Sequence, residues 1–308
     1  MRIRASFLMP NRTIIGLDVG GTKIRAGVVS SRGRLIISEK IPTEGSRGKA
    51  VVLENIVKSV RSVWQKDVKA IGVGMAGIVD HGVGVYRQGP NLPAAFKNIP
   101  IAAILRRRFR VPVKVDNDVH CFTLAEAKFG AAKRFSSVVG LTLGTGIGGG
   151  IVIGGRLYRG RDNAAGEIGH MTVSSAFPAT CGCGRKGHFE SYGSGSAMRK
   201  IHRAIAHSDL EPLAVERAAE HGNARAKKTL RIMADGLADG FANIIHVLNP
   251  EIIVVGGSIA AVDGLWKPAV AAVRDRVVYP ALRTTPIVRA ELGSDANVIG
   301  AALITEEM

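Results

Sequence analysis

Short apolar runs separated by glycines and polar residues dominate the first half of the chain. The first two runs flank a glycine turn in residues 14–29, IIGLDVGGTKIRAGVV, and a third covers about residues 35–37. Apolar runs of about four to eight residues between turn residues are typical of buried strands. By the same criterion we predict strands at residues 70–75, 111–115, 252–255 and 287–290, and a second hairpin at 138–153, which a third strand or a turn at residues 156–158 follows.

Longer segments carry apolar residues three or four positions apart, which is the spacing of an amphipathic helix. They lie between the strands in the first half of the chain and fill most of the second half. Helices are predicted at residues 53–65, 101–108, 119–130, 196–206, 213–220, 224–248, 266–278 and 297–304. The alternation of strands and helices predicts an α/β fold.

The glycine hairpin occurs twice. Residues 138–153, VVGLTLGTGIGGGIVI, repeat the first copy at a constant offset of 124, which aligns Gly20 with Gly144 (144 − 20 = 124). Glycine allows a tight turn whose backbone N–H groups can face an anion, and Thr22 and Lys23 could add to them. An ordinary β-hairpin explains either copy taken alone. The repetition favours two loops that hold a polyphosphate.

Composition limits the class of protein. The 308 residues suffice for two domains, and 46% hydrophobic and 22% charged residues are ordinary for a globular chain. No apolar run approaches the about 20 residues of a membrane helix, and residues 1–12 lack the apolar core of a secretory signal. Three cysteines argue against a disulfide framework. We therefore expect a cytoplasmic protein with no membrane partner.

The net charge of +17 is high. It could indicate nucleic-acid binding, a solvated basic face, or attraction of polyanionic phosphate donors. No helix-turn-helix pattern is predicted before the first strand, and basic runs such as residues 106–108 are short. We therefore expect a solvated basic face and no nucleic-acid partner.

One acidic segment follows the strand at 111–115. Asp116, Asn117 and Asp118 stand where this strand ends and the helix at 119–130 begins. Asp118 occupies the position of a helix N-cap, which is one explanation for it. The other is a general base, because the ends of strands in an open α/β sheet line its ligand crevice.

A group of metal-binding residue types lies within 19 positions. The four are His170, Cys181, Cys183 and His188, with glycines between them. Two thiolates and two imidazoles suit tetrahedral Zn²⁺, and with all four positions filled by protein the zinc would be structural. A metal-free glycine loop with incidental cysteines is the alternative.

The paired glycine loops resemble those of the sugar kinase/actin-like ATPase superfamily. From about Thr13 to the end, the chain more closely resembles the ROK family (repressors, open reading frames and sugar kinases). The resemblance implies a two-domain actin-like ATPase (ribonuclease H-like) fold, with duplicated βββαβαβα cores and a cleft between the domains. We expect a small domain of residues 13–117 and 295–308, and a large domain of residues 118–294 with the zinc loop and a helical insert.

The resemblance also implies roles for individual residues. Asp118 matches the catalytic base of the family. The matching sugar-binding positions are Gly77, Asn91, Asn117, Asp118, Glu167, His170 and Glu190. Those expected to bind the phosphate donor are Asp18, Gly20, Gly21, Thr22, Lys23, Gly144, Thr145, Gly146, Gly256, Gly257 and Ser258. Simple turns could explain Asn91 and the glycines, and surface exposure could explain Glu167 and Glu190. The family typically has three cysteines after its histidine, and His188 takes the place of the third.

The resemblance implies ATP-dependent phosphorylation of a hexose 6-hydroxyl by a cytoplasmic homodimer. Glucose, as in bacterial glucokinases and glycolysis, is the expected substrate. Asp18, which is Thr142 in the second copy, would reach Mg²⁺ through water. An amino sugar such as N-acetylmannosamine or N-acetylglucosamine, polyphosphate as donor, and a sugar-responsive transcriptional regulator remain alternatives.

Overall fold

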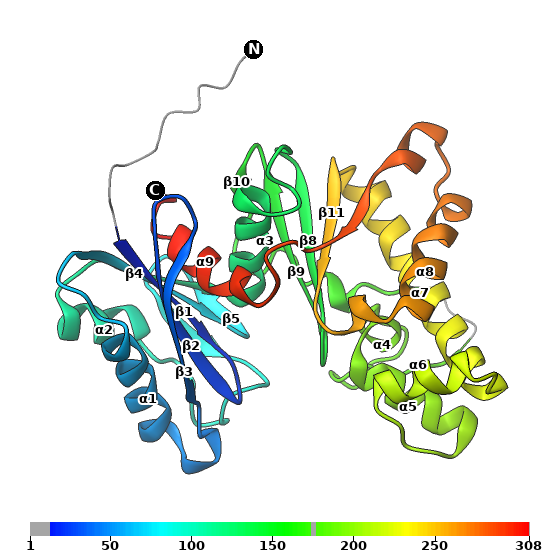
Figure 1. Cartoon of the computed structure of the whole chain (residues 1–308), viewed down its shortest axis with the longest axis horizontal. Helices are drawn as coiled ribbons and strands as arrows, with labels where there is room; N and C mark the ends of the chain where they lie inside the picture. Colours follow the sequence, from blue (N-terminus) through cyan, green and yellow to red (C-terminus); the bar gives the residue numbers. More distant parts are fainter. Residues whose placement is uncertain (1–12, 174–176, 308) are drawn as a thin grey trace. The chain divides into compact units, whose positions relative to one another are not determined.

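The computed structural model describes residues 13–173 and 177–307 (Figure 1). The N-terminal extension expected before residue 13 lies outside these residues. The chain forms two compact units. Among the described residues, the first comprises 13–133, Arg156–Ala165 and 292–307, and the second comprises Arg134–Gly155 and Gly166–Glu291.

The first unit contains a five-stranded sheet in the order β3-β2-β1-β4-β7. Its strands are β1 (Thr13–Val19), β2 (Lys23–Val29), β3 (Leu35–Pro42), β4 (Val68–Met75) and β7 (Val113–Asn117). β1, β4 and β7 are parallel, and Asp18 pairs with Gly74, which pairs with Asp116. Their carboxyl ends therefore meet at one edge of the sheet.

Helices cover both faces of this sheet (Figure 1). Alternate residues of β1, such as Ile15 and Leu17, share a core with α1 (Lys49–Ser62) and α2 (Ile101–Phe109). Gly16, on the opposite face, lies against α9 (Ala296–Leu303), where an added Cβ would lie 1.9 Å from the carbonyl oxygen of Val298. A short hairpin of β5 (Ile78–Asp80) and β6 (Val85–Gln88) was not predicted.

Helix α3 (Asp118–Phe129) also packs within the first unit. An added Cβ on Gly300 of α9 would lie 1.7 Å from the carbonyl oxygen of Cys121 on α3, so the two helix backbones touch. This division differs from the expected domain boundary after residue 117, because the close packing of α3 on α9 keeps both helices in one compact unit.

In the second unit β9, β8, β11 and β12 are neighbours in that order. Their bounds are β8 (Val138–Leu143), β9 (Ile147–Ile153), β11 (Ile252–Gly256) and β12 (Ile287–Arg289). The β8–β9 hairpin is antiparallel and β11 joins it in parallel, as β4 joins the β1–β2 hairpin. The two units thus repeat one strand arrangement, as the copied hairpins predicted. The two-residue strand β10 (Arg156–Leu157) belongs to the first unit.

The rest of the second unit is helical. Its helices are α4 (Glu190–Gly193), α5 (Gly195–Ala206), α6 (Pro212–Glu220), α7 (Ala224–Leu248) and α8 (Asp263–Arg276). The buried Phe241 of α7 lies in one core with Leu141 of β8 and Leu265 of α8. Within the described residues, the helices are all too short or too polar to cross a bilayer.

Candidate active site

Three aspartates of the first unit, Asp18, Asp116 and Asp118, lie at the carboxyl edge of its sheet. Asp18 is the last residue but one of β1 and pairs with Gly74, and Asn117 and Asp118 follow Asp116 at the end of β7. Asp18 and Asp118 are both half-buried there. The parallel arrangement of β1, β4 and β7 thus brings together two carboxylates that are 100 residues apart in the sequence (118 − 18).

The expected N-cap of α3 was wrong by one residue. Asn117 caps the helix, since its Oδ1 accepts hydrogen bonds from the backbone N–H groups of Val119 (2.7 Å) and His120 (3.2 Å). Its Nδ2 donates to the carbonyl of Gly77 at 3.0 Å. Asp118 is the first residue of the helix, so capping does not explain its carboxylate.

The electrostatic environment of Asp118 favours a proton acceptor that works near neutral pH. Burial and the charge of Asp18 raise the pKa of Asp118 to about 7. Burial also raises the pKa of Asp18, although Asn297 donates a hydrogen bond to its Oδ1 at 3.2 Å. A general base is most effective when its pKa lies near the working pH.

The first glycine loop has a fixed conformation. The N–H of Gly20 donates to the carbonyl of Lys23 (3.1 Å), and Thr43 bonds the carbonyls of Gly20 (2.7 Å) and Thr22 (3.0 Å). An added Cβ on Gly21 would lie 2.4 Å from the carbonyl oxygen of Asn91, so the loop touches the predicted sugar-binding segment. Beside it lies a hollow of about 710 Å³, lined by Gly21, Thr22, Pro42, Glu44, Gly45, Ser46, Gly48, Asn91 and Pro93.

The second glycine loop meets the start of helix α5. The N–H of Gly195 donates to the carbonyl of Gly144 (2.8 Å), and Ser196 Oγ donates to that of Thr145 (2.6 Å). The positive end of the α5 dipole therefore lies beside this loop, which favours an anion there. Gly257 adopts a φ of +94°, and a Cβ on it would lie 2.3 Å from the carbonyl oxygen of Leu143, so the predicted loop at 256–258 adjoins the same strand end.

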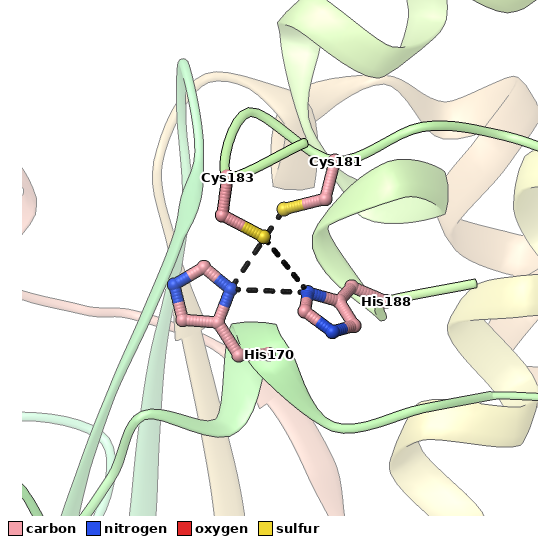
Figure 2. A group of neighbouring side chains, drawn as sticks. All are labelled: His170, Cys181, Cys183 and His188. Atoms are coloured by element: carbon pink, nitrogen blue, oxygen red, sulfur yellow. Dashed lines mark hydrogen bonds between the residues drawn. The ribbon is translucent and has the colours of Figure 1, made fainter. Parts of the chain in front are cut away.

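The four predicted metal ligands gather in one place (Figure 2). His170 Nδ1 lies 3.3 Å from His188 Nδ1 and 3.7 Å from Cys181 Sγ, and Cys183 Sγ lies 3.3 Å from His188 Nδ1. Ligand atoms of a tetrahedral Zn²⁺ are separated by about 3.3–3.8 Å, given Zn–N and Zn–S bonds of about 2.0–2.1 and 2.3 Å. The donor set and these three separations therefore fit zinc.

Two predicted sugar-binding carboxylates flank this cluster. Glu167 Oε2 lies 3.8 Å from the outward Nε2 of His170, and both side chains are exposed. Glu190 differs, because Oε2 accepts from the N–H of Ile147 (3.1 Å) and Oε1 lies 3.1 Å from Cys181 Sγ. A Cβ on Gly146 would lie 2.5 Å from Glu190 Oε2. Glu190 thus links the second glycine loop to the cysteine loop.

The predicted site residues form two groups, one in each unit. Asp18, residues 20–23, Gly77, Asn91, Asn117 and Asp118 belong to the first, and the remaining predicted residues belong to the second. Three residues that support these groups were not predicted from the sequence: Thr43, Ser196 and Asn297. A serine at the predicted start of a helix could have signalled Ser196, whereas no local signal marks Asn297, which contacts Asp18 across 279 positions.

Comparison with known proteins establishes the family. The sequence model of the ROK family matches residues 14–308. The chain belongs to the ROK family. It is 34% identical to the glucokinase of Thermotoga maritima, covering 97% of this chain and 99% of that one, and 32% identical to the N-acetyl-D-glucosamine kinase of Vibrio cholerae, covering 94% and 98%.

Solved structures agree with this assignment. The ROK hexokinase from Thermus thermophilus matches with a TM-score of 0.85 and 32% identity, covering 96% of this chain and all of that one. A ROK glucokinase from Streptomyces griseus in complex with glucose and AMPPNP matches with a TM-score of 0.80 and 30% identity, covering 96% and 100%. The chain thus has the actin-like ATPase fold of ROK sugar kinases, and its homologues support sugar kinase activity.

Proposed function

We propose that this protein transfers the γ-phosphoryl group of ATP to the 6-hydroxyl of a hexose, with glucose as the preferred acceptor. The observation that carries the proposal is Asp118, a half-buried carboxyl group with a pKa raised to about 7, at a sheet edge beside Asp18 and near the family's phosphate-loop motif. Glucokinases among the relatives support the choice of glucose.

Asp118 accepts the proton of the attacking hydroxyl as the oxygen forms its bond to phosphorus. An alcohol is a weak nucleophile, so a positioned carboxylate helps, although phosphoryl transfer depends mainly on alignment and charge stabilisation. Asn117 spends its Oδ1 on the helix cap and keeps one Nδ2 hydrogen for a sugar oxygen. The other groups proposed to orient the sugar are Gly77, Asn91, Glu167, His170 and Glu190.

The two glycine loops bind the phosphates of the donor. In the first, Gly20, Gly21, Thr22 and Lys23 supply N–H groups and a positive charge. In the second, Gly144, Thr145 and Gly146 lie at the start of α5, whose dipole favours an anion. Gly256, Gly257 and Ser258 approach the adenosine. When bound, Mg²⁺ neutralises charge that develops on the phosphates, and Asp18 would hold it through water.

The zinc we propose is structural. His170, Cys181, Cys183 and His188 would fill all four positions, leaving none for a substrate. Its role is to fix the loop that carries Glu167 and Glu190. His170 would bind the metal through Nδ1, which leaves Nε2 facing Glu167 and free to bond a sugar hydroxyl.

An N-acetylated amino sugar is the second candidate substrate, favoured by the 32% identity to an N-acetyl-D-glucosamine kinase. Glucose, mannose, N-acetylglucosamine and N-acetylmannosamine should be compared as acceptors, each with ATP and with polyphosphate, following donor consumption. We expect the highest kcat/KM for glucose with ATP. If no sugar is phosphorylated and the protein binds DNA in a sugar-dependent manner, the proposal of a kinase would be wrong and a transcriptional regulator would be the better assignment.

A matched pair of glycine variants tests the donor site. An added Cβ on Gly144 meets no protein atom within 4 Å, and on Gly82, in the β5–β6 turn, the nearest atom lies at 3.7 Å. Both substitutions should therefore preserve the fold. Gly144→Ala should raise the KM for ATP about tenfold, because the methyl group fills the space proposed for the phosphates, while Gly82→Ala should leave it unchanged. If the two variants had the same KM for ATP, the proposal that the phosphates lie beside Gly144 would be wrong.

A further inference from the structure

His120 is a buried histidine in the first turn of α3, with a relative exposure of 2%. Both of its ring nitrogens have partners. Nδ1 lies 2.9 Å from Asp116 Oδ1, and Nε2 lies 2.9 Å from the carbonyl oxygen of Ala165. A backbone carbonyl has no hydrogen to donate, so Nε2 must carry a proton. The charge of the ring then depends on whether Asp116 can donate to Nδ1.

Asp116 cannot donate, because hydrogen-bond donors already surround its carboxylate. Oδ1 accepts from the N–H of Asn117 (2.7 Å) and from Asn163 Nδ2 (3.0 Å), and Oδ2 accepts from Arg159 Nε (2.8 Å). Burial alone would raise the pKa of Asp116, but the hydrogen bonds and charges of His120 and Arg159 hold it well below its usual range. Since Asp116 is ionised, His120 Nδ1 must also carry a proton.

The surrounding charges balance a buried imidazolium. Arg159 Nη2 bonds Glu307 Oε2 at 2.5 Å, so the cations His120 and Arg159 meet the anions Asp116 and Glu307. His81 also faces Asp116 at 3.5 Å, and burial lowers its pKa. Burial would lower the pKa of His120 too, but its hydrogen bond to Asp116 and the charge of Asp116 raise it. A buried charge is tolerated when it is paired and hydrogen-bonded in this way.

We propose that His120 is protonated at neutral pH and is a positioning residue, which holds the first turn of α3, carrying Asn117 and Asp118, to the carbonyl of Ala165. The positioning role rests on the proposed function of Asp118 as the base, whereas the protonation of His120 does not. The hydrogen bond from His120 fixes the position of the Asp118 carboxylate indirectly, since the first turn of α3 begins at Asp118 and contains His120 two residues later.

The charge of His120 also acts on Asp118. A positive charge nearby favours the ionised carboxylate, against the burial and the charge of Asp18 that oppose it. The other titratable groups near Asp118 are the buried Tyr86 and Cys121, both kept neutral at pH 7 because burial raises their pKa values. Removing the imidazolium should therefore make Asp118 harder to ionise.

The protonation state of His120 can be measured on the wild-type protein, with neither a variant nor an activity assay. Long-range ¹H–¹⁵N NMR spectra of the histidine-labelled protein distinguish an imidazolium from either neutral tautomer. We expect His120 to keep the imidazolium pattern from pH 6 to pH 8. His202 is the internal control, because its relative exposure is also 2%. Within the described part of the chain its ring bonds the hydroxyl of Thr229 and no carboxylate, and burial lowers its pKa. A neutral His120 at pH 7 would overturn the proposal.

The positioning role is tested with His120→Gln, a neutral side chain that keeps one donor, beside His202→Gln. We expect His120→Gln to lower kcat about tenfold and to move the acid limb of kcat/KM upward by on the order of half a pH unit, while His202→Gln changes neither. An unchanged limb and kcat in a folded His120→Gln protein would refute the role. If the wild type phosphorylates no sugar, carboxyl ¹³C NMR of Asp118 replaces kinetics. If His120→Gln does not fold in quantity, His120→Asn is used as the second variant. In either variant the pKa of Asp118 must be higher than in the wild type, or the proposal fails.

Discussion

Replacing Asp118 by asparagine should stabilise the protein at alkaline pH. Burial and the charge of Asp18 raise the pKa of Asp118 from 3.8 to about 7 in the folded state. Between these values the folded state binds more protons than the unfolded state, so this group lowers the stability of the wild type as the pH rises from 4 to 7. Asparagine never ionises and removes that cost. The oxygen that accepts from the N–H of Val119 at 3.1 Å is retained.

The size of the effect follows from the pKa difference. One pKa unit corresponds to about 1.4 kcal/mol, so a change from 3.8 to about 7 costs about 4 kcal/mol once the group is fully ionised. At pH 5 the same linkage leaves under about 2 kcal/mol, and below pH 4 it leaves almost nothing. The difference in stability between wild type and Asp118→Asn should therefore depend on pH. This dependence, rather than the size of the difference at one pH, identifies a carboxylate whose ionisation destabilises the folded state.

Thermal unfolding of wild type and Asp118→Asn at pH 5, 6.5 and 8 measures this difference. We expect a gain of several degrees in the unfolding transition at pH 8 that shrinks steadily towards pH 5. Glu39→Gln is the charge-matched control, because Glu39 is an exposed residue of β3 in the same unit, and its variant should follow the wild type at every pH. A variant that is less stable than the wild type at pH 8, or equally shifted at all three pH values, would refute the reasoning.

Three further predictions concern activity, metal and packing. The kcat/KM for the sugar should rise with pH through about 7 and level off above it, because Asp118 must lose its proton to act as a base; a flat profile from pH 5.5 to 8 would contradict this. Elemental analysis should find about one zinc per chain, with His188→Cys keeping the metal and His188→Ala losing it along with thermal stability; a metal-free protein of full stability and activity would contradict it. Gly72→Ala should destabilise the first unit by several kcal/mol, since a Cβ there would lie 1.6 Å from the carbonyl oxygen of Ala301 on α9. Urea unfolding measures this loss, and a variant as stable as the wild type would contradict the prediction by showing that α9 can shift.

Local patterns in the sequence predicted most of the elements. Helix α7 begins and ends where expected, at residues 224 and 248, because Asn223 caps its start and Pro250 follows its end. The duplicated hairpins were predicted because glycine turns and apolar runs are local features. The gathering of the four candidate metal ligands was predicted because they lie within 19 residues of one another in the chain.

Long-range packing was beyond such patterns. Helix α3 joins the first unit through α9, which follows it by more than 160 residues. The network around Asp116 joins β7 to Arg159 and Glu307, and neither partner carries any mark of it in the sequence. The cap of α3 was misplaced by one residue because Asn117 and Asp118 are both good capping residues and only the backbone geometry distinguishes them.

The central claim is that Asp118 takes the proton from a sugar hydroxyl during phosphoryl transfer. The most direct test compares wild type and Asp118→Asn in ATP-dependent glucose phosphorylation, with glucose binding measured by calorimetry on the same samples. We expect turnover to fall by at least about a hundredfold while the glucose Kd changes little. Normal turnover in the folded variant would contradict it.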